Sequence, residues 1–261
     1  MISLVKQVDT AWHIYGARAQ EDFVVRPSMP ILYFGDALSY SRSERKVVTV
    51  GLNPSYREFG SQSQGYTIGL RFALASEIVT SRTMSTEQFC DRYQQSLNRY
   101  FEANPYWTWF RNFEPLLNAL GTDYRSNLAT SGRALHTDIC FPLATFPTWS
   151  KLKGTARSRL LEDGLVLWTD LVRELSPDVI LVSVGRELRE NVITLFGQEE
   201  HFPDMFPENP LKKALIYRTR IRGKHCFVVM GRSTDRGPFS TLTIYEKKQL
   251  GSRIDQLVSR V

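Results

Sequence analysis

Short runs of largely apolar residues recur along the chain, at residues 46–52, 134–140, 178–185 and 225–231. Their apolar side chains are nearly continuous and do not alternate strictly with polar ones. Such runs are typical of strands that are covered on both faces, as in a parallel sheet. The pattern therefore predicts about four buried strands.

Helical patterns occupy the stretches before and between these runs. Apolar residues recur at helical spacing over 4–15 and 89–101, and Ser85 with Gln88 forms a capping box before the second of these. Further helices are predicted over 106–120, 155–175, 185–196 and 241–261, with Gly121 and Gly197 as C-caps of the first and third of these. Strands that alternate with helices predict an α/β fold, a three-layer α/β/α sandwich around a mainly parallel sheet of about four strands.

The organisation of the chain predicts a single domain. Its 261 residues supply ample material for one core, and no repeat, low-complexity tract or linker-like stretch interrupts them. We expect the domain to span residues 1–261, with residues 1–45 as an N-terminal extension packed on it.

Composition narrows the class of protein. A formal charge of +6 fits a polyanionic partner. A basic soluble protein without such a partner would carry the same charge, so the charge alone does not decide between the two. Cys90, Cys140 and Cys226 are widely separated, which argues against a disulfide framework or a zinc cage. No signal peptide or apolar stretch of membrane-spanning length is evident, so we expect a cytoplasmic protein without a membrane partner.

Polar residues stand where three of the predicted strands end. The first run leads into Gly51-Leu52-Asn53-Pro54-Ser55, the second contains Asp138, and the fourth leads into the loop 231–240. Ligands of parallel sheets bind beyond the carboxyl ends of the strands, so these residues are the candidate site. The alternatives are a tight turn at Asn53 and a cap or buried salt bridge at Asp138.

The order of these motifs resembles the uracil-DNA glycosylase superfamily. "VGLNPS" is similar to the G-x-N-P motif of that family's mismatch-specific and single-strand-selective branches. "LHTDICFPL" resembles their second motif, "PDVILVSVGRELRENVITLFG" their recurrent strand-turn-helix, and "GRS" stands at the position of the final H-P-S loop. The resemblance covers roughly residues 46–245 and implies a DNA glycosylase that flips a base out of the duplex, without a metal or cofactor.

The resemblance also implies roles for individual residues. Asn53 would position the water that attacks the sugar C1′, and Asp138 would read the hydrogen-bonding edge of the base. Gly51 would let the backbone approach the nucleotide closely. The other implied contacts with the substrate come from the backbone near Leu52, the motif residues Pro54 and Ser55, a stacking ring at Phe59 or Tyr66, and a phosphate grip at Ser233.

Two departures from the family pattern affect the expected activity. The histidine of the final motif is absent, which leaves three possibilities. Arg232 substitutes for the histidine, the excised base is a better leaving group, or the protein has lost catalysis. His136 could share a pocket face with Asp138, although a structural role is the simpler reading. Asp138 stands where the family has Asn, and a carboxylate accepts well from the amino group of cytosine. We therefore expect a cytosine-type substrate, a 5-substituted cytosine such as some phage genomes contain.

Basic residues suggest a track for DNA. On a strand, every second side chain points to the same face, so Arg218, Arg220 and Arg222 would form a row that contacts phosphates. The alternative is an edge strand whose charges protect it from pairing with other strands. Arg236 or Phe239 would wedge into the duplex where the base leaves.

The sequence thus predicts a monofunctional DNA glycosylase that acts on a modified cytosine, with a role in phage defence or DNA repair. The alternatives are a uracil or mismatch repair glycosylase and a catalytically inactive nucleic-acid-binding module on the same fold. DNA is the expected partner, and no obligate protein partner is apparent.

Overall fold

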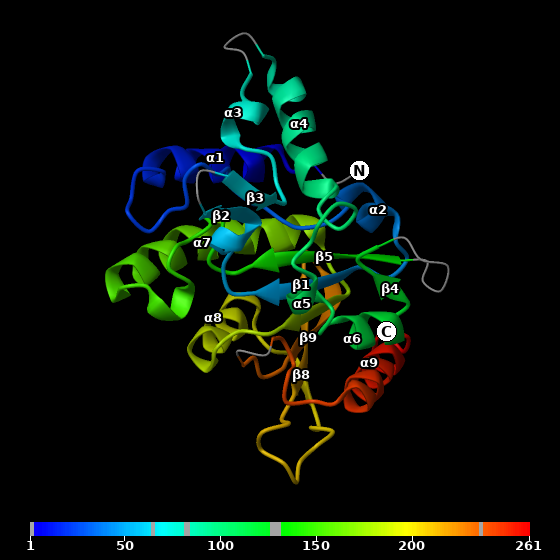
Figure 1. Cartoon of the computed structure of the whole chain (residues 1–261). Helices are drawn as coiled ribbons and strands as arrows, with labels where there is room; N and C mark the ends of the chain where they lie inside the picture. Colours follow the sequence, from blue (N-terminus) through cyan, green and yellow to red (C-terminus); the bar gives the residue numbers. More distant parts are fainter. Residues whose placement is uncertain (1–2, 64–65, 81–83, 126–131, 235–236) are drawn as a thin grey trace. The chain divides into compact units, whose positions relative to one another are not determined.

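The computed structural model describes residues 3–63, 66–80, 84–125, 132–234 and 237–261 (Figure 1). The chain divides into two compact units, each built from three segments. The first unit contains Met1–Asp36, Leu52–Tyr106 and Thr137–Glu174, and the second contains Ala37–Gly51, Trp107–His136 and Leu175–Val261. The prediction of a single domain stays a prediction.

A seven-stranded sheet has the order β4-β5-β1-β6-β9-β8-β7. Its strands lie in the second unit, except for the last two residues of β5, which belong to the first. The strands are β1 (Val47–Gly51), β4 (Thr122–Asp123), β5 (Gly132–Asp138), β6 (Val179–Val182), β7 (Glu200–Phe202), β8 (Leu215–Ile221) and β9 (Lys224–Met230).

The four predicted strands are β5, β1, β6 and β9, which are neighbours in the sheet. β6 pairs in parallel with both β1 and β9, and every residue of β1 and β6 is buried, as their apolar runs require. The α/β class and the mainly parallel sheet flanked by helices, as in an α/β/α sandwich, are therefore confirmed. The predicted number of strands is wrong, because three strands with short or polar sequences extend the two edges.

The antiparallel hairpin of β8 and β9 corrects one prediction. Ile221 pairs with Lys224, and the two residues between them, Arg222 and Gly223, have φ values of 53° and 80°. Two positive φ angles are what a tight two-residue hairpin turn demands. Arg222 therefore lies in the turn and does not continue the face of β8.

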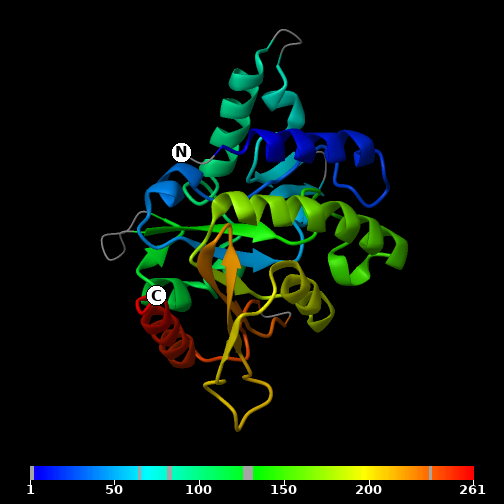
Figure 2. The same cartoon turned by 180° about the vertical axis from the view of Figure 1, so that it is seen from behind.

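The helices of the second unit are α2 (Ala37–Arg42), α5 (Trp107–Phe110), α6 (Glu114–Ala119), α8 (Arg186–Phe196) and α9 (Ile244–Val258). α9 packs closely on α6, as Figure 2 also shows. A Cβ atom at Gly251 would lie 2.6 Å from the Cβ of Ala119 and 2.9 Å from the carbonyl oxygen of Leu116. Glycine is therefore required at this contact. The predicted C-caps also hold, since Gly121 and Gly197 have φ values of 69° and 70°.

The first unit contains α1 (Val5–Arg18), α3 (Ala75–Ile78), α4 (Thr86–Asn98) and nearly all of α7 (Gly154–Leu175). It also contains the antiparallel pair β2 (Phe59–Ser63) and β3 (Tyr66–Leu70), and the 3-10 helices η1 (Tyr56–Glu58) and η2 (Trp149–Lys151). The capping box of Ser85 and Gln88 starts α4, as predicted.

An aromatic cluster fills the core of the first unit beside β2. The ring of Tyr100 stacks on Phe72 at 4.8 Å and meets the ring of Phe34 edge-on at 4.9 Å. These rings are nearly or fully buried, so the segments that carry them are held together mainly by apolar burial.

Candidate functional site

The loops that follow β1 and β5 are joined by backbone hydrogen bonds within the first unit. The amide of Cys140 donates to the carbonyl of Leu52 at 2.8 Å, and the amide of Thr145 donates to the carbonyl of Pro54 at 3.1 Å. Tyr56 then donates its amide to the carbonyl of Thr145 at 3.0 Å. The two segments that carry the first and second sequence motifs are therefore neighbours, as are the strands β1 and β5 that they follow.

Asn53 is held at this junction by its side-chain nitrogen. Nδ2 donates to the hydroxyl of Thr145 at 2.8 Å and to the carbonyl of Pro54 at 2.9 Å. Among the described residues, no donor contacts Oδ1, so this oxygen has the capacity to accept a further hydrogen bond. Sequence reasoning missed Thr145, which is completely buried and fixes the amide from the neighbouring loop.

Asp138 is the last residue of β5 and is only 6% exposed. The preceding Thr137 is buried and accepts a hydrogen bond from the indole of Trp168 at 3.0 Å, which fixes the end of the strand against α7. A buried carboxylate is costly unless polar partners or charges compensate it, so its presence at the end of the strand is a sign of function or of a specific pairing.

Glu58 provides a second buried carboxyl, which the sequence analysis did not single out. It ends η1, is 5% exposed, and accepts a hydrogen bond from the hydroxyl of Tyr100 at 2.8 Å. Burial raises the pKa of Glu58 to about 7, the charge of Asp138 adds to the rise, and Arg71, Tyr100 and Arg57 oppose it. Glu58 can therefore hold or release a proton near neutral pH.

The local fold explains why Glu58 points inward. Ser55 precedes η1 and caps it by accepting the amide of Arg57 at 3.3 Å, and the amide of Glu58 donates to the carbonyl of Ser55 at 3.1 Å. This tight turn directly follows Asn53-Pro54, so the motif residue Ser55 has a structural role. The neighbouring sequence gives no signal for Glu58, because its hydrogen-bond partner Tyr100 is distant along the chain.

The two candidate stacking rings have different outcomes. Phe59 is 3% exposed and packs on Phe72 with ring centroids 6.1 Å apart, so its ring belongs to the core. The backbone of Tyr66 begins β3, but its side chain lies outside what the structure describes.

The loop after β9 belongs to the second unit. Gly231 is buried, Arg232 is exposed and Ser233 is half-buried. Arg189, on α8, donates to the carbonyl of Gly231 at 2.7 Å, and its pKa is lowered by burial and by the charge of Arg232. Two neighbouring guanidinium groups give this loop a positive potential, which suits an anion.

The predicted wedge at Phe239 is wrong. Its ring is fully buried, and a Cβ atom at Gly231 would lie 2.1 Å from it. Its amide donates to the hydroxyl of Ser183 at 3.1 Å, and its ring meets Phe113 at 5.9 Å, so it is a core residue. Arg236, the other candidate wedge, lies outside the described residues.

The predicted arginine row on β8 is already paired with carboxylates. Arg220 contacts Glu199 at 2.7 Å, and Arg218 contacts Glu200 at 3.1 Å. With Arg222 in the hairpin turn, the three arginines do not form one row. The arrangement favours the alternative, a sheet edge protected by charge.

His136 is a structural residue of the second unit. Its Nδ1 lies 2.8 Å from the hydroxyl of Thr49, which in turn lies 2.6 Å from the hydroxyl of Tyr124. Its ring meets Phe110 edge-on at 4.9 Å and is buried. These contacts explain the polar residue in β5 without a catalytic role.

A groove of about 920 Å³ lies beside α1 and α4 in the first unit, lined in part by Trp12 and Phe89. It contains none of the predicted site residues. Among the described residues, no group of three or more histidine, cysteine, aspartate or glutamate side chains is arranged to hold a metal ion. In the same part of the chain, no helix has the length and apolarity needed to cross a bilayer.

Comparisons with known proteins assign no family. No protein-family model matches the chain, and no curated protein matches it significantly.

Proposed function

We propose that the chain is a monofunctional DNA glycosylase that hydrolyses the bond between deoxyribose and a modified cytosine. The observation that carries this proposal is the fixed amide of Asn53. Thr145 and Pro54 hold its nitrogen, so that its oxygen is oriented to accept a hydrogen bond from a water molecule. A water held in this way is the nucleophile that glycosidic hydrolysis needs.

The two buried carboxyls, Asp138 and Glu58, suit a cytosine-type base. Cytosine presents an amino donor at N4 and acceptors at N3 and O2, whereas uracil presents a donor at N3. An ionised Asp138 would accept from the amino group, and a protonated Glu58 would donate to an acceptor on the ring. The charge of Asp138 disfavours ionisation of Glu58, which favours this division of roles.

The proposed reaction balances as a hydrolysis. The water held by Asn53 attacks C1′ of the sugar and loses a proton to solvent, while the C1′–N1 bond breaks and its electron pair leaves with the base. Glu58 gives its proton to the departing base and is protonated again from solvent. Neutralising the leaving group in this way would replace the support that the family's histidine gives.

An abasic-site assay tests the proposal. DNAs that contain cytosine, uracil, 5-methylcytosine or 5-hydroxymethylcytosine would be treated with enzyme and then with alkali. We expect strand cleavage at a 5-substituted cytosine by the wild type, and its loss in Asn53→Ala and Asp138→Asn. Asn118→Ala, which changes an exposed asparagine of α6, serves as the matched control and should retain activity.

The other outcomes separate the alternatives. Cleavage at uracil would contradict the cytosine assignment and favour a repair glycosylase. Absence of product on every DNA, with DNA binding intact, would favour an inactive binding module, which the absent histidine in "GRS" also allows. Activity that survives in Asn53→Ala would remove the basis of the proposal.

A further inference from the structure

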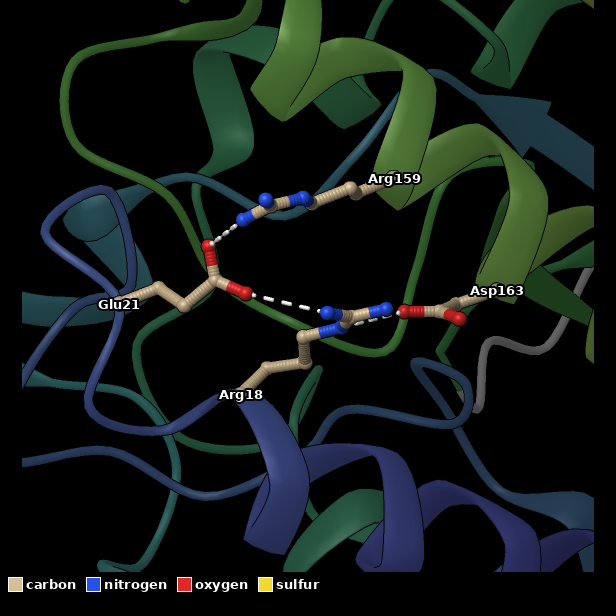
Figure 3. A network of polar contacts seen from close by, with 4 residues as sticks. All are labelled: Arg18, Glu21, Arg159 and Asp163. Atoms are coloured by element: carbon tan, nitrogen blue, oxygen red, sulfur yellow. Dashed lines mark hydrogen bonds and ion pairs between the residues drawn. The ribbon is translucent and has the colours of Figure 1, made fainter.

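Arginine side chains of the first unit differ in what neutralises them. Figure 3 shows a network in which Arg18 contacts Asp163 at 2.9 Å and Glu21 at 3.2 Å, and Arg159 contacts Glu21 at 2.6 Å. Two guanidinium groups are thus balanced by two carboxylates. Such a network holds α7 to the end of α1 and leaves little charge for a polyanion.

Arg57 and Arg71 have neutral partners instead. Arg57 donates to the hydroxyl of Tyr106, and its guanidinium carbon lies 5.1 Å from the centre of that ring. Arg71 lies 5.4 Å from the same ring and donates to the carbonyl of Asn104 at 2.8 Å. Within the described part of the chain, neither forms an ion pair. The carboxyl of Glu58, which interacts with both charges, has a pKa of about 7 and is therefore only partly ionised at neutral pH. Much of the positive charge of the two arginines is thus available to a ligand.

Exposed aromatic surface lies next to these arginines. The side chain of Phe146 is 60% exposed, and its ring meets the ring of Tyr56 edge-on at 5.2 Å. Tyr56 in turn lies 6.0 Å from the guanidinium of Arg57. Phe146 directly follows Thr145, which holds the amide of Asn53, so the aromatic surface is continuous in sequence with the candidate site.

Phe146 also lines a hollow that contains lysines. The hollow has a volume of about 310 Å³, and its lining includes Lys151 and Lys153, neither of which has an ion pair among the described residues. Glu21 and Asp22 line the same hollow, but Glu21 is the carboxylate that Arg18 and Arg159 neutralise. The hollow therefore adds two lysines and one acid, Asp22, that is unpaired in the described part of the chain, to the surroundings of the exposed ring.

We infer that the aromatic–arginine surface, formed by Tyr56, Arg57, Arg71, Tyr106 and Phe146, binds the single-stranded segment of DNA that flanks the excised nucleotide. This inference rests on the proposed function for the identity of the nucleic acid. Guanidinium groups contact phosphates, and aromatic faces stack on bases without a requirement for a particular sequence. This surface, and not the arginine row that the sequence suggested on β8, is then the part of the protein that contacts DNA.

Binding can be measured apart from catalysis. A fluorescently labelled single-stranded oligonucleotide that lacks any substituted base would be titrated with protein over a series of salt concentrations. We expect Arg57→Gln to weaken binding and to reduce the slope of log K against log salt by about 0.7, the value for one phosphate contact on a single strand. Arg173→Gln changes the charge by the same amount at an exposed arginine of α7 that contacts Asp170 and does not line the hollow, and it should leave the slope unchanged.

Phe146 offers a second variant that removes no charge. We expect Phe146→Leu to weaken binding about tenfold at every salt concentration, because it removes a stacking face and no phosphate contact. Phe146→Tyr keeps the face and should restore the affinity. The exposed position makes both substitutions compatible with folding, which thermal unfolding would verify.

The outcomes separate this inference from the proposed function. If wild type makes abasic sites but Arg57→Gln and Phe146→Leu bind DNA as wild type does, the surface is wrong and the function stands. If wild type makes no abasic sites but these variants lose binding, the surface stands and the function is wrong. Wild type that neither binds DNA nor makes abasic sites would overturn both.

Discussion

Replacing Glu58 by glutamine tests whether the second carboxyl of the site is buried in its protonated form. The substitution keeps the size of the side chain and an oxygen that accepts from Tyr100, but it removes the titrating group. Glu58 has a pKa of about 7 in the folded protein, against an ordinary value of 4.5. Between the pKa of the unfolded state and that of the folded state, Glu58 is protonated in the folded protein but ionised in the unfolded chain. The free energy of unfolding of the wild type therefore falls as pH rises through this range.

The size of the effect follows from the difference between the two pKa values. One pKa unit corresponds to about 1.4 kcal/mol, so the burial of an ionised Glu58 destabilises the folded wild type by about 3 kcal/mol above neutral pH. Below the ordinary pKa of glutamate this destabilisation is absent. Because Glu58→Gln has no ionisable group at this position, its stability does not fall in this way, and the variant should gain stability relative to wild type as pH rises.

Urea unfolding measures this gain directly. Free energies of unfolding would be determined for wild type and Glu58→Gln from about pH 5 to about pH 8, the range over which most of the difference develops. Glu102→Gln, which changes an exposed glutamate of the same unit, is the matched control. A constant difference between wild type and Glu58→Gln at all pH values would refute the reasoning, because Glu58 would then titrate alike in both states.

Three further predictions concern single contacts. Thr145→Val removes the acceptor of the Asn53 amide, so it should lower kcat and reduce the free energy of unfolding by about 1 kcal/mol. Thr145→Ser keeps the hydroxyl and should retain most activity. Steady-state kinetics and urea unfolding measure these effects in both variants. Tyr100→Phe removes a hydrogen bond that lowers the pKa of Glu58, so the pH-dependent change in stability should shift to higher pH in the same unfolding series. Gly251→Ala should destabilise the second unit by about 1 to 3 kcal/mol, because the new methyl group overlaps α6, and thermal unfolding would reveal unaltered stability if this contact were wrong.

The sequence was informative wherever a residue's own chemistry determined its environment. Buried strands require apolar runs, so β1, β5, β6 and β9 were predicted from composition and length alone. Asn53 and Asp138 stood out because polar residues at the ends of such runs are unusual. The structure brings their two loops together through Leu52 and Cys140, as parallel neighbours require.

The sequence was uninformative where the environment comes from distant segments. Nothing in "SYREFG" indicates that Glu58 is buried against Tyr100, more than forty residues away along the chain. Phe239 lies in a polar loop, yet its ring fills the space that Gly231 leaves free. The arginines of β8 read as a phosphate track because the carboxylates that pair with them lie on another strand and its approach.

The most direct test of the central claim is to identify what the protein releases. DNA that contains 5-hydroxymethylcytosine would be incubated with wild type or Asn53→Ala, and the small-molecule fraction analysed by mass spectrometry. We predict that wild type releases the free base in amounts equal to the abasic sites formed, and that Asn53→Ala releases none. Intact DNA with no free base of any kind, or a free base released equally by both proteins, would contradict the account.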